Sequence, residues 1–422
     1  MKKKIVTKVI FSVTGKAVHN KIFKANGLNP GVGGTEFVTI ILAFALANQR
    51  KDYEVFLWSE APFKLQNPPK NLKQILIKEA PFPTSKLFNS TDTIFICSDG
   101  ALQNQKFSDK LIKCKIVNWL HHPFKIPFNY KYLKFSAHVS VGIYQYFSNN
   151  FWYKPHWHIP NLFNIKLFNF SKYKFFKSNK TLRLVFLGAL IPAKGFHHVA
   201  KAWLKIKKKF PNVHLDVIGS TKTYNGEEPE NKKIPTTDSY ANKILKFIPS
   251  EDLSSKRVIF HGNLGEEKFK IIKNAHLAIL NPTGKSEAFP SSPIECLMCG
   301  TPVIASNDYG MLDVMYYFPE AKLSRPSEIT IKLISIINNS SMYRNLQKRS
   351  LSVAKSFSGN KPKILLSWQN LIDNLKANNI IYSNPPIATP KFQFFSSNGL
   401  VLAIRILMYS ILRALKLILK KE

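Results

Sequence analysis

Two glutamates separated by seven residues are the best candidates for chemistry in this chain of 422 residues. Glu287 and Glu295 lie between two apolar, strand-like runs at 276–280 and 302–305. A strand, a loop, a helix and a second strand make a parallel βαβ unit, and ligands bind at the carboxyl ends of such strands. We therefore expect Glu287 at the mouth of a crevice and Glu295 about one helical turn inside it.

The residues between these glutamates predict the start of a helix. Pro293 suits a first turn, because the N–H group that proline lacks would be unpaired there in any case. A helix that begins near Ser291 and Ser292 would direct its free N–H groups at the crevice, where they can bind phosphate. A buried turn that carries one isolated glutamate is the alternative interpretation.

A glycine-rich loop precedes the first long helix. Gly31, Gly33 and Gly34 come before an apolar run at 37–47, which predicts a helix buried beneath a sheet. Glycines let the backbone approach a ligand with its N–H groups free. The spacing is not G-x-G-x-x-G and no acidic residue follows in the dinucleotide pattern, so NAD binding is disfavoured.

Cationic and titratable side chains follow two other predicted strands. Lys194 stands after the strand predicted at 182–188 and just before an amphipathic helix, where a lysine can neutralise phosphate. The strand predicted at 115–120 ends in His121 and His122, and a histidine can exchange hydrogen bonds with a sugar hydroxyl. A structural histidine is the alternative, and the sequence does not decide which of the two faces inward.

Strand-like runs alternate with helical segments along both halves of the chain. In the first half, the predicted strands are 5–14, 53–58, 74–77, 93–97, 115–120 and 138–141. This alternation predicts an α/β fold with doubly wound parallel sheets. Because the chain is too long for one ordinary core, two domains are expected.

The segment around the two glutamates resembles the E-x7-E signature of the retaining glycosyltransferases of family 4. The strand before Lys194-Gly195, the Phe-His-Gly at 260–262 and the Gly-Thr-Pro-Val at 300–303 occur in the order that this family shows. The resemblance implies the GT-B fold, in which two Rossmann-like doubly wound parallel-sheet domains face a cleft. The chain departs from the family pattern at Ala288 and Cys299, and Ala189 replaces an arginine that contacts pyrophosphate.

The resemblance also implies a division of the chain. Residues 1–168 are expected to form the acceptor-side domain, 169–180 a linker and 181–358 the domain that binds a nucleotide sugar. Residues 359–380 are expected to form a helix that returns to the first domain. A linker and a basic amphipathic helix are expected over 381–422.

Roles for individual residues follow from the same resemblance. Glu287 is expected to bind donor-sugar hydroxyls, Glu295 the nucleotide ribose, and one of His121 and His122 to lie beside the sugar; Glu287 and these histidines are the catalytic candidates. The expected donor site also contains Gly33, Gly34, Lys194, Asn263, Leu264, Phe289, Pro290, Ser291 and Ser292. No Asp-x-Asp sequence occurs, so neither a metal nor a cofactor is expected.

The charge of the chain favours anionic partners. Lysine and arginine total 61 against 25 acidic residues, a net charge of +36. The apolar run Leu400–Leu419 carries Arg405, Arg413 and Lys416 on one side of a helix, which predicts an amphipathic helix at an anionic membrane surface. A membrane span and docking on the protein itself are the alternatives. No basic face with interleaved aromatics is found, so no nucleic-acid partner is expected.

Together with these features, the resemblance implies a glycosyltransferase that moves a sugar from a nucleoside diphosphate sugar to a glycan or lipid-linked acceptor with retention, in cell-surface polysaccharide or lipopolysaccharide synthesis. A sugar-nucleotide epimerase of the same fold, or an inactive sugar-nucleotide-binding protein, is the alternative. Four cysteines are too few for a disulfide framework, which favours a reducing cytoplasm. The expected location is the inner face of the cytoplasmic membrane.

Overall fold

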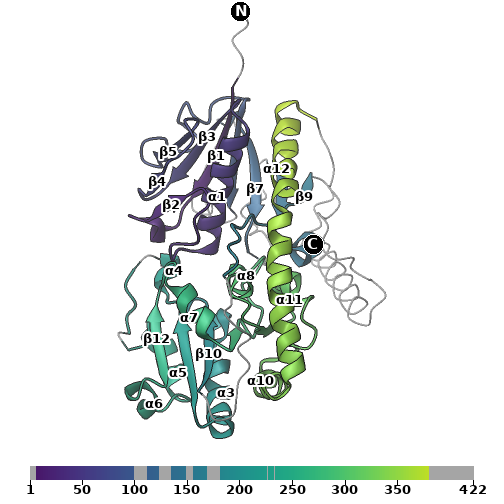
Figure 1. Ribbon diagram of the computed structural model, residues 1–422. Coiled ribbons are helices and arrows are strands. Elements are labelled where there is room, and N and C mark those ends of the chain that lie inside the picture. Colours follow the sequence, from purple (N-terminus) through teal and green to yellow (C-terminus); the bar gives the residue numbers. More distant parts are fainter. Residues whose placement is uncertain are drawn as a thin grey trace, which may run out of the picture.

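The computed structural model describes residues 6–98, 112–122, 135–148, 155–168, 181–225, 227–231 and 233–379. Two parallel sheets form the centres of two α/β domains, which lie one above the other in Figure 1. The predicted linker at 169–180 and the predicted tail helix lie outside the described residues. Within the described residues, no helix is both long and apolar enough to cross a bilayer.

The first domain is built on a seven-stranded parallel sheet of order β5-β3-β1-β6-β7-β8-β9. Its strands are β1 (Thr7–Val13), β3 (Tyr53–Ser59), β5 (Leu72–Leu76), β6 (Thr93–Ser98), β7 (Lys115–Leu120), β8 (Phe135–Ser140) and β9 (His156–His158). The chain passes to opposite sides of β1, so the strand order reverses between β1 and β6. The predicted doubly wound parallel sheet is confirmed.

Alternate residues of β1 enter two different cores. Val9 and Phe11 belong to the main core, whereas Ile10 joins a separate cluster on the other side of the sheet with Trp58 and Phe95. The rings of Trp58 and Phe95 meet edge to face with centroids 5.4 Å apart. Both sides of the sheet are therefore apolar, which explains why the strand is a continuous apolar run without alternation.

The second domain repeats the arrangement with a six-stranded parallel sheet of order β12-β11-β10-β13-β14-β15. Its strands are β10 (Leu182–Leu187), β11 (Val213–Ile218), β12 (Val258–Gly262), β13 (Leu277–Leu280), β14 (Val303–Ser306) and β15 (Lys322–Leu323). Here the order reverses between β10 and β13. A crevice at such a reversal is where open α/β sheets bind ligands.

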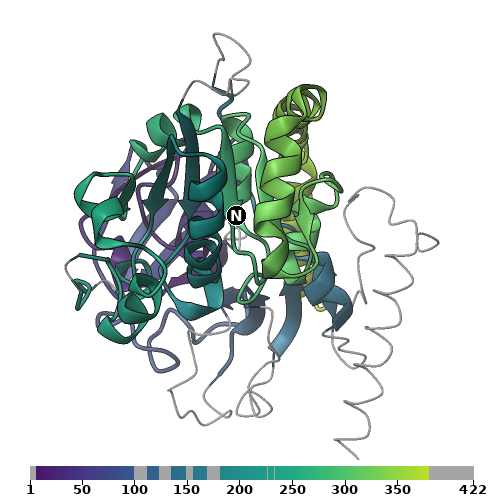
Figure 2. The same ribbon diagram turned by 90° about the horizontal axis from the view of Figure 1, so that it is seen from below.

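Helices cover these sheets and connect the domains. They are α1 (Gly34–Gln49), α2 (Ile143–Ser148), α3 (Phe196–Lys209), α4 (Lys222–Asn225), α5 (Asp238–Leu245), α6 (Ser250–Ser254), α7 (Lys268–Asn274), α8 (Ser291–Met298), α9 (Leu312–Met315), α10 (Ile329–Asn338), α11 (Ser340–Gly359) and α12 (Lys361–Lys376). In Figures 1 and 2, α11 and α12 lie along one side of the molecule. A small parallel sheet of β2 (Ile22–Lys24) and β4 (Lys64–Gln66) was not predicted.

The segment 220–237, which its polar composition predicts to be an exposed loop, is buried in part. Ile234 and Thr236 are fully buried. The Thr236 hydroxyl donates a hydrogen bond of 2.5 Å to the carbonyl oxygen of Leu190. The segment departs from the expected exposed loop at these positions, because a few buried residues anchor a mainly polar segment on the turn after β10.

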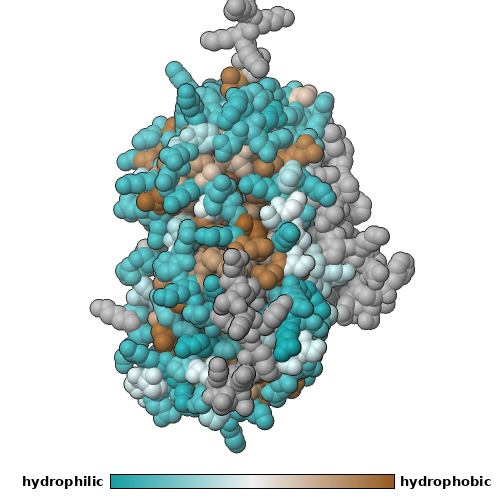
Figure 3. Space-filling view, in the orientation of Figure 1, coloured by the Kyte–Doolittle hydropathy of each residue, from teal (hydrophilic) through white to brown (hydrophobic). Residues whose placement is uncertain are grey.

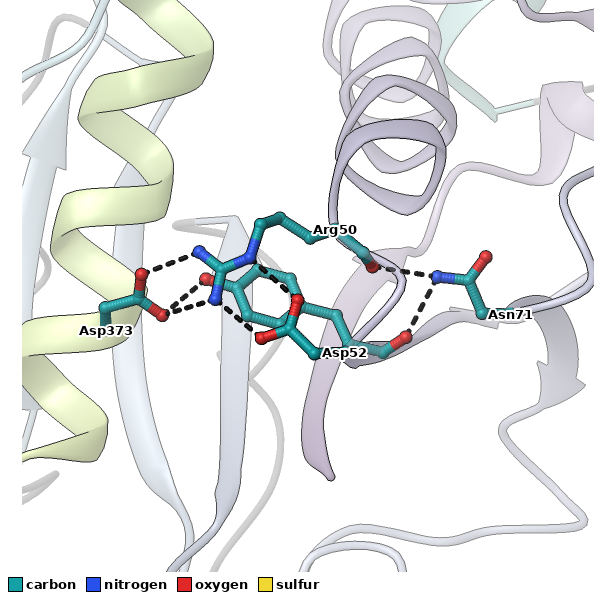
Figure 4. Close-up of polar contacts among 5 residues, drawn as sticks. Arg50, Asp52, Asn71 and Asp373 are labelled. Atoms are coloured by element: carbon teal, nitrogen blue, oxygen red, sulfur yellow. Dashed lines mark hydrogen bonds and ion pairs between the residues drawn. The ribbon is translucent and has the colours of Figure 1, made fainter. Parts of the chain in front are cut away.

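Helix α12 lies within the segment 359–380 that was expected to form a helix, and it is fixed to the first domain. Trp368 is fully buried, with its ring edge to face against Phe11 at 6.4 Å. On the rim, Arg50 forms paired hydrogen bonds with Asp373, and the Tyr53 hydroxyl donates to the same carboxylate at 2.7 Å (Figure 4). The chain thus crosses from the second domain to the first through α11 and α12.

Candidate active site

A cavity of about 370 Å³ lies between the two domains, within the size range of small-molecule sites. Residues that directly follow β7, β10, β11 and β12 line it, so it lies at the carboxyl ends of both sheets. Figure 3 shows hydrophobic residues gathered at mid-height, where the domains meet. The predicted residues that line the cavity are Gly34, His121, His122, Lys194, Asn263, Leu264, Glu287, Phe289, Ser291, Ser292 and Glu295. Gly33 and Pro290 flank this lining.

The glycine-rich loop forms the first domain's side of the cavity and is shaped by Asn29. The Asn29 carboxamide oxygen accepts hydrogen bonds from the N–H groups of Gly31 and Val32, both at 2.9 Å. Gly31 has a φ of +91°, and a Cβ atom there would lie 2.9 Å from the carbonyl oxygen of Leu264. The loop therefore packs directly on the turn of the second domain that contains Leu264, a residue of the expected donor site. Asn29 was not predicted as a site residue.

Gly33 does not line the cavity; its lack of a side chain leaves space for the carboxylate of Glu36, in the first turn of α1. A Cβ atom on Gly33 would lie 2.2 Å from one oxygen of that carboxylate, and a Cβ atom on Gly15 would lie 2.4 Å from the other. Withdrawal from solvent raises the pKa of Glu36, and a backbone hydrogen bond and the charge of His122 partly oppose this rise. Any side chain at Gly33 would displace Glu36.

Lys194 and Glu287 form an ion pair at the reversal point of the second sheet. Lys194 ends a short 3-10 turn, Pro192–Lys194, after β10, and Glu287 follows β13. Their Nζ and Oε1 atoms are 2.5 Å apart, and the side chains are 10% and 13% exposed. Asn281 donates to the same Glu287 oxygen at 3.2 Å. The cation expected at phosphate and the carboxylate expected at sugar are therefore direct neighbours.

A second ion pair lies deeper in the same cavity. Lys268 Nζ is 2.7 Å from Glu295 Oε1, and the two side chains are 5% and 10% exposed. Lys268 was not singled out in the sequence. One signal was present, because Lys268 and Ile272 occupy positions i and i+4 of α7 and so share its buried side. A lysine on the apolar side of an amphipathic helix indicates a buried charged partner.

Both histidines at the end of β7 border the cavity. His121 is buried, with its ring 4.4 Å from that of Trp119, and His122 is exposed. The carbonyl oxygen of His122 accepts a hydrogen bond of 2.6 Å from the side chain of Gln145. The structure therefore places His121 in the cavity wall and His122 at its open edge.

Asp313 joins the domains beside Glu287. Its Oδ1 atom accepts a hydrogen bond of 3.3 Å from the N–H group of Ile143, at the start of α2. Its Oδ2 atom has no hydrogen-bond partner among the described residues. Burial raises the pKa of Asp313 from its ordinary value of 3.8 to about 8. At neutral pH this contact is therefore made by a protonated carboxyl group.

The raised pKa of Asp313 predicts a loss of stability with rising pH. The folded state holds the proton more tightly than the unfolded chain, so the stabilising contribution is complete below about pH 4 and is lost as the pH rises toward about 8. We expect the thermal unfolding temperature of the wild type to fall relative to that of Asp313→Asn between pH 5 and pH 9. The exposed Asp238→Asn is the control. If the difference in unfolding temperature between wild type and Asp313→Asn stays constant from pH 5 to pH 9, the pKa of Asp313 is not raised as described.

Among the described residues, no group of three histidine, cysteine, aspartate or glutamate side chains is arranged to hold a metal ion. Cys296 and Cys299, which form a C-x-x-C sequence, are both fully buried in or next to α8. Desolvation raises the pKa of the Cys296 thiol well above its ordinary value. The pair is therefore part of the core beneath the site.

Residues 168–351 match the family model described as "Glycosyl transferases group 1". The matched segment contains Lys194 and both glutamates, the residues that form the two ion pairs of the cavity. The match supports a group 1 glycosyltransferase. It covers the second domain and leaves the first domain, with the glycine-rich loop and the histidines, outside the matched segment.

Whole-chain comparisons cover both domains. An uncharacterized glycosyltransferase of Haemophilus influenzae is 24% identical over 365 residues, which cover 81% of this chain and 96% of the relative. The structure of HepE from Anabaena, in complex with UDP-glucose, superposes with a TM-score of 0.60 at 15% identity, over 86% of this chain and 100% of HepE. Sucrose-phosphate synthase from Thermosynechococcus elongatus gives 0.59 at 15% identity, over 88% and 100%. The expected GT-B fold is confirmed.

Proposed function

We propose that this group 1 glycosyltransferase is a retaining hexosyltransferase of family 4, which transfers a sugar from a nucleoside diphosphate sugar to a glycan or lipid-linked acceptor. The observation that carries the proposal is the Lys194–Glu287 pair in the crevice between β10 and β13, next to the start of α8. A lysine and free N–H groups suit a diphosphate, and a carboxylate suits sugar hydroxyls. The glycine-rich loop closes the crevice from the first domain.

In the proposed reaction, the bond between the anomeric carbon and the diphosphate oxygen breaks, and a bond to the acceptor oxygen forms on the same side of the sugar. Negative charge grows on the leaving diphosphate, where Lys194 and the N–H groups at Ser291 and Ser292 stabilise it. Glu287 binds donor-sugar hydroxyls and Glu295 the ribose. His121 or His122 hydrogen-bonds to the sugar at the edge formed by the first domain.

HepE contains UDP-glucose in its structure, so UDP-sugars are the first donors to test. The experiment measures the thermal unfolding temperature with UDP-, GDP- and ADP-sugars, followed by transfer to extracted cell-surface glycans and lipids. Stabilisation by one donor class and transfer with retained anomeric configuration are expected. Binding without transfer would favour the alternative of an epimerase or an inactive binding protein. We further propose that no metal takes part, so activity is expected to persist in EDTA.

We also propose a place of action at the cytoplasmic face of the membrane, in synthesis of a cell-surface polysaccharide or lipopolysaccharide. The net charge of +36 and the basic, apolar sequence Leu400–Leu419 support this proposal, since such a segment favours an anionic lipid surface. Deleting the residues after Ser396 is expected to move the protein from the membrane fraction to the supernatant. A distribution that does not change on deletion would contradict attachment through this segment.

A further inference from the structure

Lys268 has a buried ammonium group that the protein satisfies only in part. Its side chain is 5% exposed and lies at the start of α7. An ammonium carries three N–H donors. Among the described residues, the ammonium donates one hydrogen bond, of 2.7 Å, to Glu295. Its Nζ atom also lies 5.4 Å from the centroid of the Phe269 ring, a cation–π distance.

Lys207 shows how the protein satisfies a lysine that has a structural role. Its Nζ atom donates to Glu251 at 3.1 Å and to both carboxylate oxygens of Asp252 at 3.1 and 3.0 Å. Lys268, in contrast, borders the cavity with donor capacity that has no acceptor in the part of the chain that the structure describes. Buried polar groups are rarely left without partners, so the unused donors of Lys268 indicate a ligand with acceptor oxygens.

The two ion pairs stand at opposite ends of the E-x7-E segment. Lys194 pairs with Glu287, at the start of that segment, and Lys268 pairs with Glu295, inside α8. In the proposed function, Glu287 binds the sugar and Glu295 the ribose, and the diphosphate joins these two groups. Lys194 then stands on the sugar side of the diphosphate and Lys268 on the nucleoside side. Lys194 and Lys268 are the two lysines or arginines in the lining of this cavity among the described residues.

We propose that Lys268 is the second cation of the donor site and binds the phosphate next to the nucleoside. It keeps its hydrogen bond to Glu295 and uses its remaining N–H donors for phosphate oxygens. The position where a second cation was expected holds Ala189, which also borders the cavity, so α7 supplies the charge that the turn after β10 lacks. This inference rests on the proposed function, because it needs a nucleoside diphosphate in the cavity.

The test compares the affinity of UDP and of uridine for matched variants by calorimetry. Lys268→Met alone leaves the Glu295 carboxylate buried without its cation, which can destabilise the protein. The decisive comparison is therefore between two variants that both lack this carboxylate: the double variant Lys268→Met/Glu295→Gln and the single variant Glu295→Gln. The additional loss of the lysine is expected to weaken UDP binding roughly tenfold to a hundredfold, as for a hydrogen bond to a charged group. Uridine binding, which involves no phosphate, is expected to change little. Lys270→Met, an exposed lysine on the same helix, is the matched control.

The outcomes separate this inference from the proposed function. Equal UDP affinity for the double variant and Glu295→Gln would overturn the role of Lys268. An equal loss for UDP and uridine would also overturn it, because Lys268 would then act on the nucleoside and not on the phosphate. If the wild type binds none of UDP, GDP and ADP, the proposed function itself fails.

Discussion

Replacing Lys194 by methionine is expected to lower kcat/KM for sugar transfer by about 100-fold or more. The ammonium lies 2.5 Å from Glu287 in the crevice of the second sheet and the Lys194 side chain is 10% exposed, so little water is available to replace it as a partner for a leaving diphosphate. Charge stabilisation in such a water-poor site is worth more than in solution. Initial rates measured at varied donor concentration would give the change in kcat and KM separately.

The fall is expected mainly in kcat, because charge on the diphosphate grows as the glycosidic bond breaks. Lys201→Met is the matched control, since Lys201 is an exposed lysine on α3, directly after the Lys194 turn. Lys194→Met/Glu287→Gln separates a lost function from a destabilised fold, because it leaves no unpaired carboxylate. A Lys194→Met enzyme with nearly normal kcat and an intact fold would remove Lys194 from the reaction.

The strands, the helices between them and the doubly wound fold class follow from local features of the sequence. Apolar runs such as Val9–Val13 identify strands that are buried on both sides, and amphipathic segments such as 196–209 identify the helices between them. Parallel strands joined through helices then lead to doubly wound sheets. Each step depends on residues close together in the chain, which is why the fold class was predictable.

The contacts within the site depend on residues far apart in the sequence. Lys194 and Glu287 are 93 residues apart, and Lys268 and Glu295 are 27 apart. The sequence indicated Lys194 and both glutamates through their places after predicted strands. It assigned Lys194 to the phosphate and Glu287 to the sugar, but it did not predict that these two side chains form an ion pair. Lys268 was missed because its one local signal, a place on the buried side of α7, distinguishes it from the many surface lysines only once its partner Glu295 on α8 is known.

The junction between the domains was not predictable for the same reason. Asp313 reaches Ile143 across 170 residues, and nothing near Asp313 in the sequence indicates that it is buried. The glycine-rich loop was recognised through its composition. Its contact with Leu264 was not, because that contact depends on how the two domains are set against each other.

Replacing Gly142 by alanine is expected to lower kcat/KM by about 100-fold, although Gly142 contacts no substrate in the proposed reaction. A Cβ atom on Gly142 would lie 2.0 Å from the carbonyl oxygen of Ala288, whereas real Cβ atoms essentially never come within 3.0 Å of another heavy atom. One of the two backbones must therefore move by about 1 Å. Ala288 is bonded to Glu287, so the movement either shifts Glu287 or separates the domains at the cavity.

Both responses misplace the reacting groups, and one measurement distinguishes them. Separation of the domains increases the radius of gyration in solution scattering, whereas a shift confined to the Glu287 segment leaves it unchanged. Gly359→Ala is the matched control, because a Cβ at Gly359, the last residue of α11, meets no atom within 4 Å. Normal kcat/KM in Gly142→Ala would mean that the contact between Gly142 and Ala288 is not kept during turnover. The reaction would then take place with the domains farther apart than in this structure, and the loop of the first domain would not contribute to donor binding.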